Sequence, residues 1–463
     1  MLPDAVSKHL DDNREGNLAR LKELIAFPSV ANSRPDDCRR CAEWLVARLE
    51  SLGLTARVVE GEGRPNVIAS CHADDAAPTL LIYGHYDVQP AEPLDEWQTD
   101  PFDAVVRDGF LYGRGASDDK GQLSAHLAAI EAWQRAGGGL PVNVKLLAEG
   151  EEEIGSPTME SFLAAHAEEL SADAAVISDG EFHAPGVPAI TYALRGLAYV
   201  EVTFRGPSAD IHSGVHGGAV TNPINALARL VAALHDDAGR VALEGYYDDV
   251  LPLSGEERAA WERLGHDEGE YARSLGVAAL GGGEKAFAPL ERRWARPTLD
   301  CNGIVGGYTG VGSKTIIPAM ASAKISMRLV ADQDPKKVVA AFERFVAAHT
   351  PPGIVAETRL NAEARPVLLR RESAEMDAGR AALTEAFGRE PVFVRHGASV
   401  PITEQIQRLL GLDAVLMGFG LPDDNIHSPN ERFAVEQLHG AARACAAFYQ
   451  NLRKGLTRPG ESG

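Results

Sequence analysis

Residues 79–89 read Thr-Leu-Leu-Ile-Tyr-Gly-His-Tyr-Asp-Val-Gln, an apolar run that ends in a His-x-Asp pair. Short apolar runs bounded by turn residues are typical of buried strands in a parallel sheet. A strand over 79–83 would place His85 at its carboxyl end, the edge where α/β proteins bind ligands. Further on, Gly-Arg-Gly-Ala-Ser-Asp-Asp-Lys-Gly at 113–121 sets two adjacent aspartates at the start of a helical stretch. Together the two segments indicate metal-binding chemistry at the ends of two elements of an α/β sheet.

The same pattern of short buried strands and amphipathic helices covers both ends of the chain. It predicts further strands over 66–71, 142–147, 174–178 and 413–418. It also predicts helices over 17–27, 37–52, 119–136, 157–170, 373–387 and 434–453. For the helix over 157–170, Ser156 is the expected N-cap and Pro157 the expected first-turn residue.

Between these ends the pattern changes. Alternating strands are predicted over 198–204 and 321–330, and helices over 223–235 and 335–349. This order is typical of a smaller α+β domain with one open sheet face, and the charged, Gly-rich stretch 236–297 is expected to be an irregular insertion in it. We therefore predict an α/β fold with a mostly parallel-sheet catalytic domain, helices on both faces, over 1–197 and 369–463. An inserted α+β domain over 198–368 interrupts it.

Length, charge and cysteine content exclude several classes of function. The chain of 463 residues is long enough for two domains. Its formal net charge of −21 argues against nucleic acid and anionic membranes as partners, because a phosphate-binding surface needs positive charge. No apolar run is long enough for a transmembrane helix, and no signal-peptide pattern opens the chain. Five cysteines are too few for a disulfide framework, so we expect a cytoplasmic protein.

Several acidic and histidine residues are candidates for metal chemistry, although each has a simpler explanation. His85 with Asp87 alone is more typical of a surface turn, but a metal-bound imidazole usually donates its other N–H to such a carboxylate. Asp118 with Asp119 can be an ordinary helix cap. One aspartate can also bridge two cations with its two oxygens. The triplet Glu151-Glu152-Glu153 can be a solvated acidic loop, or one glutamate can bind a metal while its neighbour acts as general base.

Asp179 and His427 complete the set, since each follows a predicted strand. Singly, each is more typical of a structural residue. Collectively, His85, Asp118, Glu153, Asp179 and His427 are oxygen and nitrogen ligands at the ends of five separate elements. A bridging aspartate with one histidine and one carboxylate on each side is the ligand set of a dinuclear zinc hydrolase. Ligand type alone does not fix which metal is bound.

Five motifs, in order along the chain, resemble the dinuclear zinc metallopeptidase family of aminoacylase, glutamate carboxypeptidase, succinyl-diaminopimelate desuccinylase and carnosinase. They are Tyr-Gly-His-Tyr-Asp-Val-Gln-Pro at 83–90, Leu-Tyr-Gly-Arg-Gly-Ala-Ser-Asp-Asp-Lys-Gly at 111–121, Glu-Gly-Glu-Glu-Glu-Ile-Gly-Ser at 149–156, Asp-Ile-His-Ser-Gly at 210–214 and Ile-His-Ser-Pro-Asn-Glu at 426–431. The wording of the first motif, with Ser-Lys-Thr-Ile-Ile-Pro at 313–318, is most similar to the carnosinase and cytosolic non-specific dipeptidase branch.

The resemblance implies a role for each matching residue at the metal centre. Asp118 would bridge two divalent metal ions, with zinc the first choice and manganese the alternative. His85 and Asp179 would complete one site, and Glu153 and His427 the other. Glu152 would be the general base that moves a proton from the attacking water to the leaving amine, and Asp87 would orient His85. The family also implies a cis peptide bond between Asp118 and Asp119.

The resemblance further implies that the inserted domain is a lid and dimerisation domain. In a homodimer, His212 would reach the partner's active site and stabilise the oxyanion, and Arg328 would bind the substrate's C-terminal carboxylate. Gly397 and Ser399 would touch the substrate backbone. His396 departs from the family, which usually has an acid at that position. The side-chain preference is therefore left open.

The leading hypothesis is a dinuclear metal-dependent dipeptidase that cleaves short peptides with a free C-terminal carboxylate. An alternative on the same site is a deacylase acting on N-acyl or N-carbamoyl amino acids. A third, of another class, is a catalytically silent peptide-binding protein. The presence of Glu152 together with all five ligand candidates argues against the silent protein.

Overall fold

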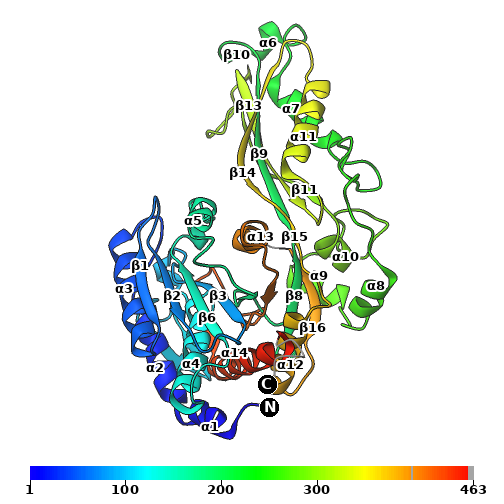
Figure 1. Ribbon diagram of the computed structural model, residues 1–463. Helices are drawn as coiled ribbons and strands as arrows, with labels where there is room; N and C mark the ends of the chain where they lie inside the picture. Colours follow the sequence, from blue (N-terminus) through cyan, green and yellow to red (C-terminus); the bar gives the residue numbers. More distant parts are fainter. Residues whose placement is uncertain (398–399, 457–463) are drawn as a thin grey trace. The chain divides into compact units, whose positions relative to one another are not determined.

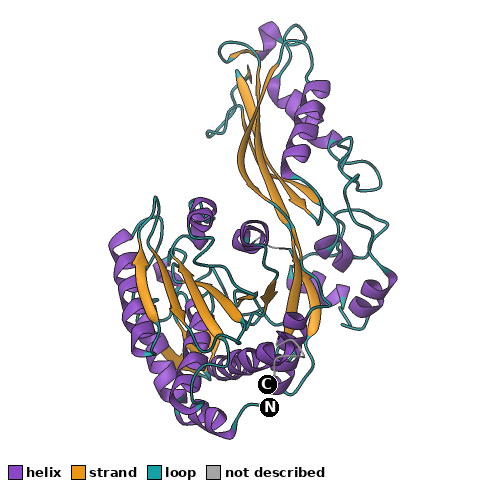
Figure 2. Cartoon of the chain, in the orientation of Figure 1, coloured by secondary structure: helices purple, strands orange, loops and turns teal. Residues whose placement is uncertain are grey.

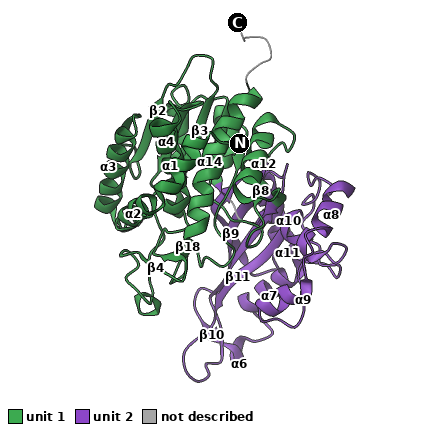
Figure 3. Ribbon diagram, turned by 90° about the horizontal axis from the view of Figure 1, so that it is seen from below, with its two compact units in different colours: residues 1–192, 369–394, 401–463 green, residues 193–368, 395–400 purple. Residues whose placement is uncertain are grey.

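The computed structural model describes residues 1–397 and 400–456, and the chain divides into two compact units (Figures 1 and 3). Unit 1 comprises Met1–Tyr192, Leu369–Val394 and Pro401–Gly463, and unit 2 comprises Ala193–Leu368 and Arg395–Val400. The short segment Arg395–Val400 therefore belongs to the same unit as the inserted part of the chain. The sequence had predicted it as part of the catalytic domain. Within the described residues, no helix is long and apolar enough to cross a membrane.

The main sheet confirms the predicted α/β class (Figure 2). Its strands are, in sheet order, β1 (Thr55–Val59), β2 (Asn66–Cys71), β6 (Asn143–Glu149), β3 (Thr79–His85), β7 (Ala174–Ile177), β17 (Ala414–Leu416), β8 (Ala189–Leu194) and β15 (Val367–Leu368), and β16 (Val392–His396) also pairs with β8. The four central strands, β6, β3, β7 and β17, run parallel. β2 runs antiparallel to β6, although its apolar sequence had placed it among the parallel strands. The carboxyl ends of the four central strands therefore lie at one edge of the sheet.

Helices pack around this sheet. They are α1 (Asp4–Asp12), α2 (Arg14–Ile25), α3 (Pro35–Ser51), α4 (Lys120–Ala136), α5 (Met159–Ala165), α12 (Ala374–Phe387), α13 (Pro401–Gln405) and α14 (Val435–Leu456). α3, α4 and α12 lie within two residues of the predicted limits and α2 and α14 within three, α5 is shorter than predicted, and α1 and α13 were not predicted. α3 packs on β1 and β2, α4 packs on β3, and α14 packs against both α4 and α12. The short helical turns η1 (Leu94–Glu96), η2 (Glu152–Ile154) and η3 (Ile406–Leu410) and the strand β16 (Val392–His396) complete this set.

The predicted start of the helix at Ser156 is wrong. Ser156 has a positive φ of 52°, and its N–H donates to the carbonyl of Glu151 at 3.0 Å. That hydrogen bond closes the turn that carries the acidic residues, so Ser156 serves the turn and not the helix. Thr158 occupies the N-cap position, and α5 begins one residue later.

A small antiparallel sheet brings two of the sequence motifs together. It consists of β4 (Val105–Arg107), β5 (Phe110–Tyr112) and β18 (Arg432–Ala434). β5 leads directly into the Gly-rich motif at 113–121, and β18 directly follows the motif at 426–431. Because β18 pairs with β5, the Gly113 N–H can donate to the Glu431 carbonyl at 3.0 Å. The loops that carry Asp118 and His427 are therefore held side by side.

Unit 2 is built on a four-stranded antiparallel sheet. The sheet order is β11 (Thr298–Gly306), β13 (Met320–Leu329), β9 (Gly196–Arg205) and β14 (Val355–Ala364). Alternate residues of β9 are fully buried in a hydrophobic core, under helices α7 (Pro223–Ala233) and α11 (Pro335–His349). The period-two alternation that predicted a half-exposed strand is thus explained by a sheet with helices on one face.

Short elements complete unit 2. They are β10 (Ile211–His212), β12 (Ile316–Ile317), β15 (Val367–Leu368), α6 (Ser213–His216), α8 (Gly255–Glu262), α9 (Glu268–Ser274) and α10 (Pro289–Trp294). β10 pairs with β12, and β15 pairs with the last two residues of β8. The segment 236–297, expected to be irregular, holds the three short helices α8, α9 and α10.

Candidate metal centre

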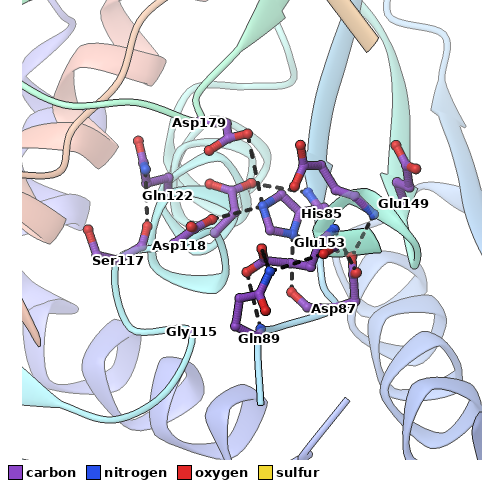
Figure 4. Close-up of polar contacts among 12 residues, drawn as sticks. His85, Asp87, Gln89, Gly115, Ser117, Asp118, Gln122, Glu149, Glu153 and Asp179 are labelled. Atoms are coloured by element: carbon purple, nitrogen blue, oxygen red, sulfur yellow. Dashed lines mark hydrogen bonds and ion pairs between the residues drawn. The ribbon is translucent and has the colours of Figure 1, made fainter. Parts of the chain in front are cut away.

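The predicted ligands come from the carboxyl edge of the main sheet and from two adjoining loops, those of Asp118 and His427. Figure 4 labels four of them: His85, Asp118, Glu153 and Asp179. His85 is the last residue of β3, and Asp179 lies two residues beyond β7. Glu153 lies in η2, which follows β6, and His427 lies in the loop between β17 and β18. Parallel strand ends meet at one edge, so residues far apart in the sequence converge there.

Asp118 lies between the two histidines. Its Oδ1 is 3.0 Å from Nε2 of His85, and its Oδ2 is 3.0 Å from Nε2 of His427. Each carboxylate oxygen therefore faces a different imidazole, as a bridge between two cations requires. The Asp118–Asp119 peptide bond is cis, as the family resemblance implied.

The other carboxylates divide between the two histidines. Oδ2 of Asp179 lies 4.0 Å from Nε2 of His85, and Oε2 of Glu153 lies 3.1 Å from Nε2 of His427. Two groups result, each with donor atoms within 4.8 Å of one another: His85 with Glu152 and Asp179, and Asp118 with Glu153 and His427. Glu152, the expected general base, is therefore a member of the first group.

The electrostatics of this cluster favour bound cations. Burial, together with the negative charge of Asp118, raises the pKa of Asp179 to about 7. Burial likewise raises the pKa of Glu152 well above its usual range. Ionised carboxylates buried this way need compensating positive charge. Asp118, Glu152, Glu153 and Asp179 carry four negative charges when ionised, which two divalent cations would balance.

The donor set fits such cations. Each group offers one imidazole nitrogen and two carboxylates, a combination that suits zinc and also manganese. His85 is fully buried and His427 is half exposed, so the two groups differ in their access to solvent. The residues present therefore fit a dinuclear site without selecting the metal.

Asp87 has a second role beside the predicted one. Nδ1 of His85 lies 3.1 Å from the backbone carbonyl oxygen of Asp87 and 3.4 Å from its Oδ1, so both oxygens orient the imidazole. The same carboxylate accepts the backbone N–H of Glu152 at 3.2 Å and that of Glu153 at 3.0 Å. One buried side chain thus fixes a predicted ligand and also the turn that carries the predicted general base.

Sequence reasoning missed the role of Gln89. Its side-chain amide donates to Oε2 of Glu153 at 2.9 Å and to the Glu153 carbonyl at 3.0 Å, and its backbone N–H donates to Oε1 at 3.2 Å. Gln89 therefore fixes the orientation of the Glu153 carboxylate. Its place two residues after Asp87, in the same motif, was the available signal.

Glu431 was also missed as a functional residue. Its carboxylate is fully buried and accepts from Nη1 of Arg114 at 2.8 Å and from the backbone N–H groups of Gly115, Ser117 and Asp118 at 2.9, 2.9 and 3.1 Å. The loop that carries Asp118 is thus folded around one carboxylate from the loop that carries His427. A glutamate at the end of the Ile-His-Ser-Pro-Asn-Glu motif was the signal.

The residues expected to contact substrate belong to unit 2. His212 is an exposed N-cap whose Nδ1 accepts the N–H of Gly214 at 3.0 Å. Arg328 is half-buried in β13, and Gly397 follows β16. Ser399 lies outside the residues that the structure describes. The metal-ligand candidates belong to unit 1, so the predicted chemistry and the predicted substrate contacts lie in different units.

Comparison with known proteins places the chain in a family. Residues 81–451 match the model of peptidase family M20/M25/M40. The chain belongs to this peptidase family. As an M20 peptidase it has relatives over nearly its full length: it is 32% identical to the Cys-Gly metallodipeptidase dug1 of Schizosaccharomyces pombe, over 96% of this chain and 98% of the relative. It is 31% identical to the human Beta-Ala-His dipeptidase, over 97% of this chain and 93% of the relative.

A solved structure supports the same assignment. The M20 family metallo-carboxypeptidase Sso-CP2 from Sulfolobus solfataricus superposes on this M20 peptidase with a TM-score of 0.85 and 34% identity, over 95% of this chain and 99% of that one. The predicted resemblance to the carnosinase and dipeptidase branch is confirmed by these comparisons, and so is the prediction of a metallopeptidase.

Proposed function

We propose that this M20 peptidase hydrolyses dipeptides or short peptides bearing a free C-terminal carboxylate, with two divalent metal ions. The observation that carries the proposal is Asp118, with one oxygen 3.0 Å from His85 and the other 3.0 Å from His427. The full-length similarity to a Cys-Gly and a Beta-Ala-His dipeptidase supports a dipeptide as substrate.

In the proposed centre, Asp118 would hold both metal ions. His85 and Asp179 would complete one site, and Glu153 and His427 would complete the other. When bound, the cations would polarise the scissile carbonyl and lower the pKa of the attacking water. Zinc is the first choice and manganese the alternative.

Glu152 is the proposed general base. Its burial raises its pKa well above the usual range for glutamate, which helps the carboxylate to hold a proton during turnover. It takes a proton from the attacking water and then gives it to the amine that leaves. Asp87 fixes the backbone N–H of Glu152, so the base keeps its position through both transfers.

Substrate contacts are proposed for four residues of the inserted domain and its return segment. The guanidinium of Arg328 binds the substrate's C-terminal carboxylate, because a planar fork matches two carboxylate oxygens. Gly397 and Ser399 contact the peptide backbone. His212 stabilises the oxyanion in the partner's active site, so the proposed active form is a homodimer. A cytoplasmic location is proposed with it.

A substrate panel tests the reaction. The metal-loaded full-length enzyme is assayed with Cys-Gly, β-Ala-His and other dipeptides, and with N-acetyl and N-carbamoyl amino acids. We expect higher kcat/KM on the dipeptides. A higher kcat/KM on the acyl set would replace the dipeptidase by the deacylase, and no turnover of any substrate would favour the silent peptide-binding protein.

A further inference from the structure

The segment 236–297 has a small apolar core with buried charges in it. Trp261 of α8 and Trp294 of α10 are both buried, and their ring centroids are 5.2 Å apart in an edge-to-face arrangement. Two carboxylates are buried nearby, those of Glu257 and Glu284. Buried carboxylates are costly unless paired, so their partners indicate what the segment holds in place.

The arginine partners of the two carboxylates lie in different parts of the chain. Glu284 pairs with Arg296, at 2.7 and 3.1 Å, and lies 3.5 Å from Arg240, so these contacts stay within the segment. Glu257 forms an ion pair with Arg395, which lies 138 positions along the chain. The Glu257 contact therefore ties the segment to the end of β16.

Glu257 is fixed through both of its oxygens. Oε2 accepts the backbone N–H of Ser254 at 3.2 Å and its hydroxyl at 3.0 Å, in a capping box that starts α8. Oε1 accepts from Nη2 of Arg395. The guanidinium carbon of Arg395 lies 5.6 Å from the ring centroid of Trp261, and the two charged side chains are each 9% exposed. The ion pair is thus desolvated and has little freedom to rearrange.

A second contact holds the backbone two residues further on. Nε of Arg195 donates to the carbonyl of Gly397 at 3.2 Å. A Cβ atom at residue 397 would lie 3.0 Å from Nη2 of Arg195, so the glycine allows this close approach. Arg395 and Gly397 are therefore each anchored, on either side of His396.

Arg195 also lies near the proposed carboxylate site. Arg328 pairs with Leu197 in the register of β13 and β9, and Leu197 lies two residues beyond Arg195. Burial, together with the positive charge of Arg328, lowers the pKa of Arg195 to about 10. The anchored segment 395–397 and Arg328 therefore both neighbour Arg195 in unit 2.

We propose that Glu257 and Arg195 are positioning residues for substrate selection, which fix residues 395–397 next to Arg328 through the Glu257–Arg395 pair and the Arg195–Gly397 hydrogen bond. This rests on the proposed function, because Gly397 contacts the substrate backbone only if that proposal holds. The segment 236–297 then acts on substrate binding while contributing no group to the reaction. His396, where the family usually has an acid, is presented to the substrate by the same two anchors.

The test compares two buried carboxylates of the same segment. In Glu257→Gln, the charge of the carboxylate that pairs with Arg395 is lost, so the anchor at Arg395 is weakened. We expect KM to rise about tenfold, with kcat within about twofold of wild type, which is the pattern for lost ground-state binding. Glu284→Gln is the matched control, since its partners lie within the segment, and its KM should stay at the wild-type value. Metal content should be unchanged in both.

The outcomes separate the two proposals. Wild-type turnover of dipeptides or acyl amino acids decides the proposed function, and the KM ratios are measured on whichever substrate the wild type cleaves. An unchanged KM in Glu257→Gln, or an equal rise in Glu284→Gln, would overturn the positioning role. If Glu257→Gln does not fold, Arg195→Met keeps an unbranched side chain of similar length but removes the donor to Gly397. The same rise in KM is expected there, and its absence would overturn the role.

Discussion

The metal centre and the proposed substrate contacts differ in how the chain builds them. In unit 1, His85 and the loop of Asp118 are held by Asp87 and Glu431, two buried acidic residues that themselves belong to the sequence motifs. In unit 2, His212 lies on an exposed two-residue strand, and Gly397 is held by Arg195, which lies in none of the motifs. The difference teaches that the supports of the metal centre are contained in the motifs, whereas those of the proposed substrate contacts lie outside them.

The largest expected effect comes from the bridging carboxylate. Asp118→Asn keeps the side-chain volume but removes the charge that both histidines face. We expect less than one metal ion per chain and a loss of roughly 10⁴-fold in kcat/KM. Elemental analysis and kinetics on the same preparation measure both. Asp423→Asn, an exposed carboxylate in the loop of His427, is the control and should keep both metals.

Glu152→Gln should separate metal binding from proton transfer. We expect full metal content with kcat lower by about 10³-fold, because a neutral amide cannot accept a proton from water. Metal analysis is paired with kcat. A variant that loses one metal ion as well would show that Glu152 is a ligand and not the base. Its place in the group with His85 and Asp179 makes that outcome a real alternative.

Glu431→Gln should weaken the metal centre without touching a ligand. The amide cannot accept all four donors that meet the carboxylate, so the loop of Asp118 loses part of its support. We expect metal affinity to fall by roughly 10- to 100-fold, the usual range for residues that support ligands. Chelator competition measures it. Unchanged affinity would mean that Asp118 needs no support from this loop.

Arg328→Lys tests the proposed substrate contacts of unit 2. A lysine keeps the charge but loses the planar fork, so KM for dipeptides should rise about tenfold with metal content unchanged. The same assay with C-terminally amidated dipeptides should show little difference between variant and wild type. An equal effect on amides would remove Arg328 from the carboxylate site.

The smallest effect concerns stability in acid. Burial lowers the pKa of His126 to about 3, and the ring hydrogen-bonds Tyr449 and Ser178. The folded pKa lies below the unfolded value near 6.5, so this contribution to stability is present above pH ~6.5 and is lost as the pH falls toward 3. His126→Gln should therefore flatten the decline of Tm between pH 7 and 5. An identical decline in both proteins would contradict this.

The sequence predicted the parts of the fold that repeat a local pattern. The limits of α4, α7, α11 and α12 follow their apolar periodicity, and the strand before His85 follows its unbroken apolar run. The direction of β2 was not predictable, because an apolar run looks the same in parallel and antiparallel pairs. Serine is a favoured N-cap residue, but the backbone N–H of Ser156 closes the acidic turn before it, with a positive φ. Ser156 therefore does not cap α5.

Some residues of the candidate site could be predicted from the sequence, and others could not. His85, Asp118, Glu153 and His427 could be listed from motifs and Asp179 from its place after a predicted strand, and the structure brings all five together. The four donors that converge on Glu431 could not be foreseen, since they depend on β18 pairing with β5. The grouping of Arg395 with unit 2 had no local signal either, because its partner Glu257 lies in a segment without periodic pattern.

The central claim is that one carboxylate, Asp118, joins two metal sites. Titration of the metal-free enzyme with Mn²⁺, followed by electron paramagnetic resonance, tests it directly. We predict that the spectrum at two equivalents shows an exchange-coupled pair and that the isolated six-line signal disappears. A six-line signal that grows in proportion to both equivalents, or binding that stops at one equivalent, would contradict the account.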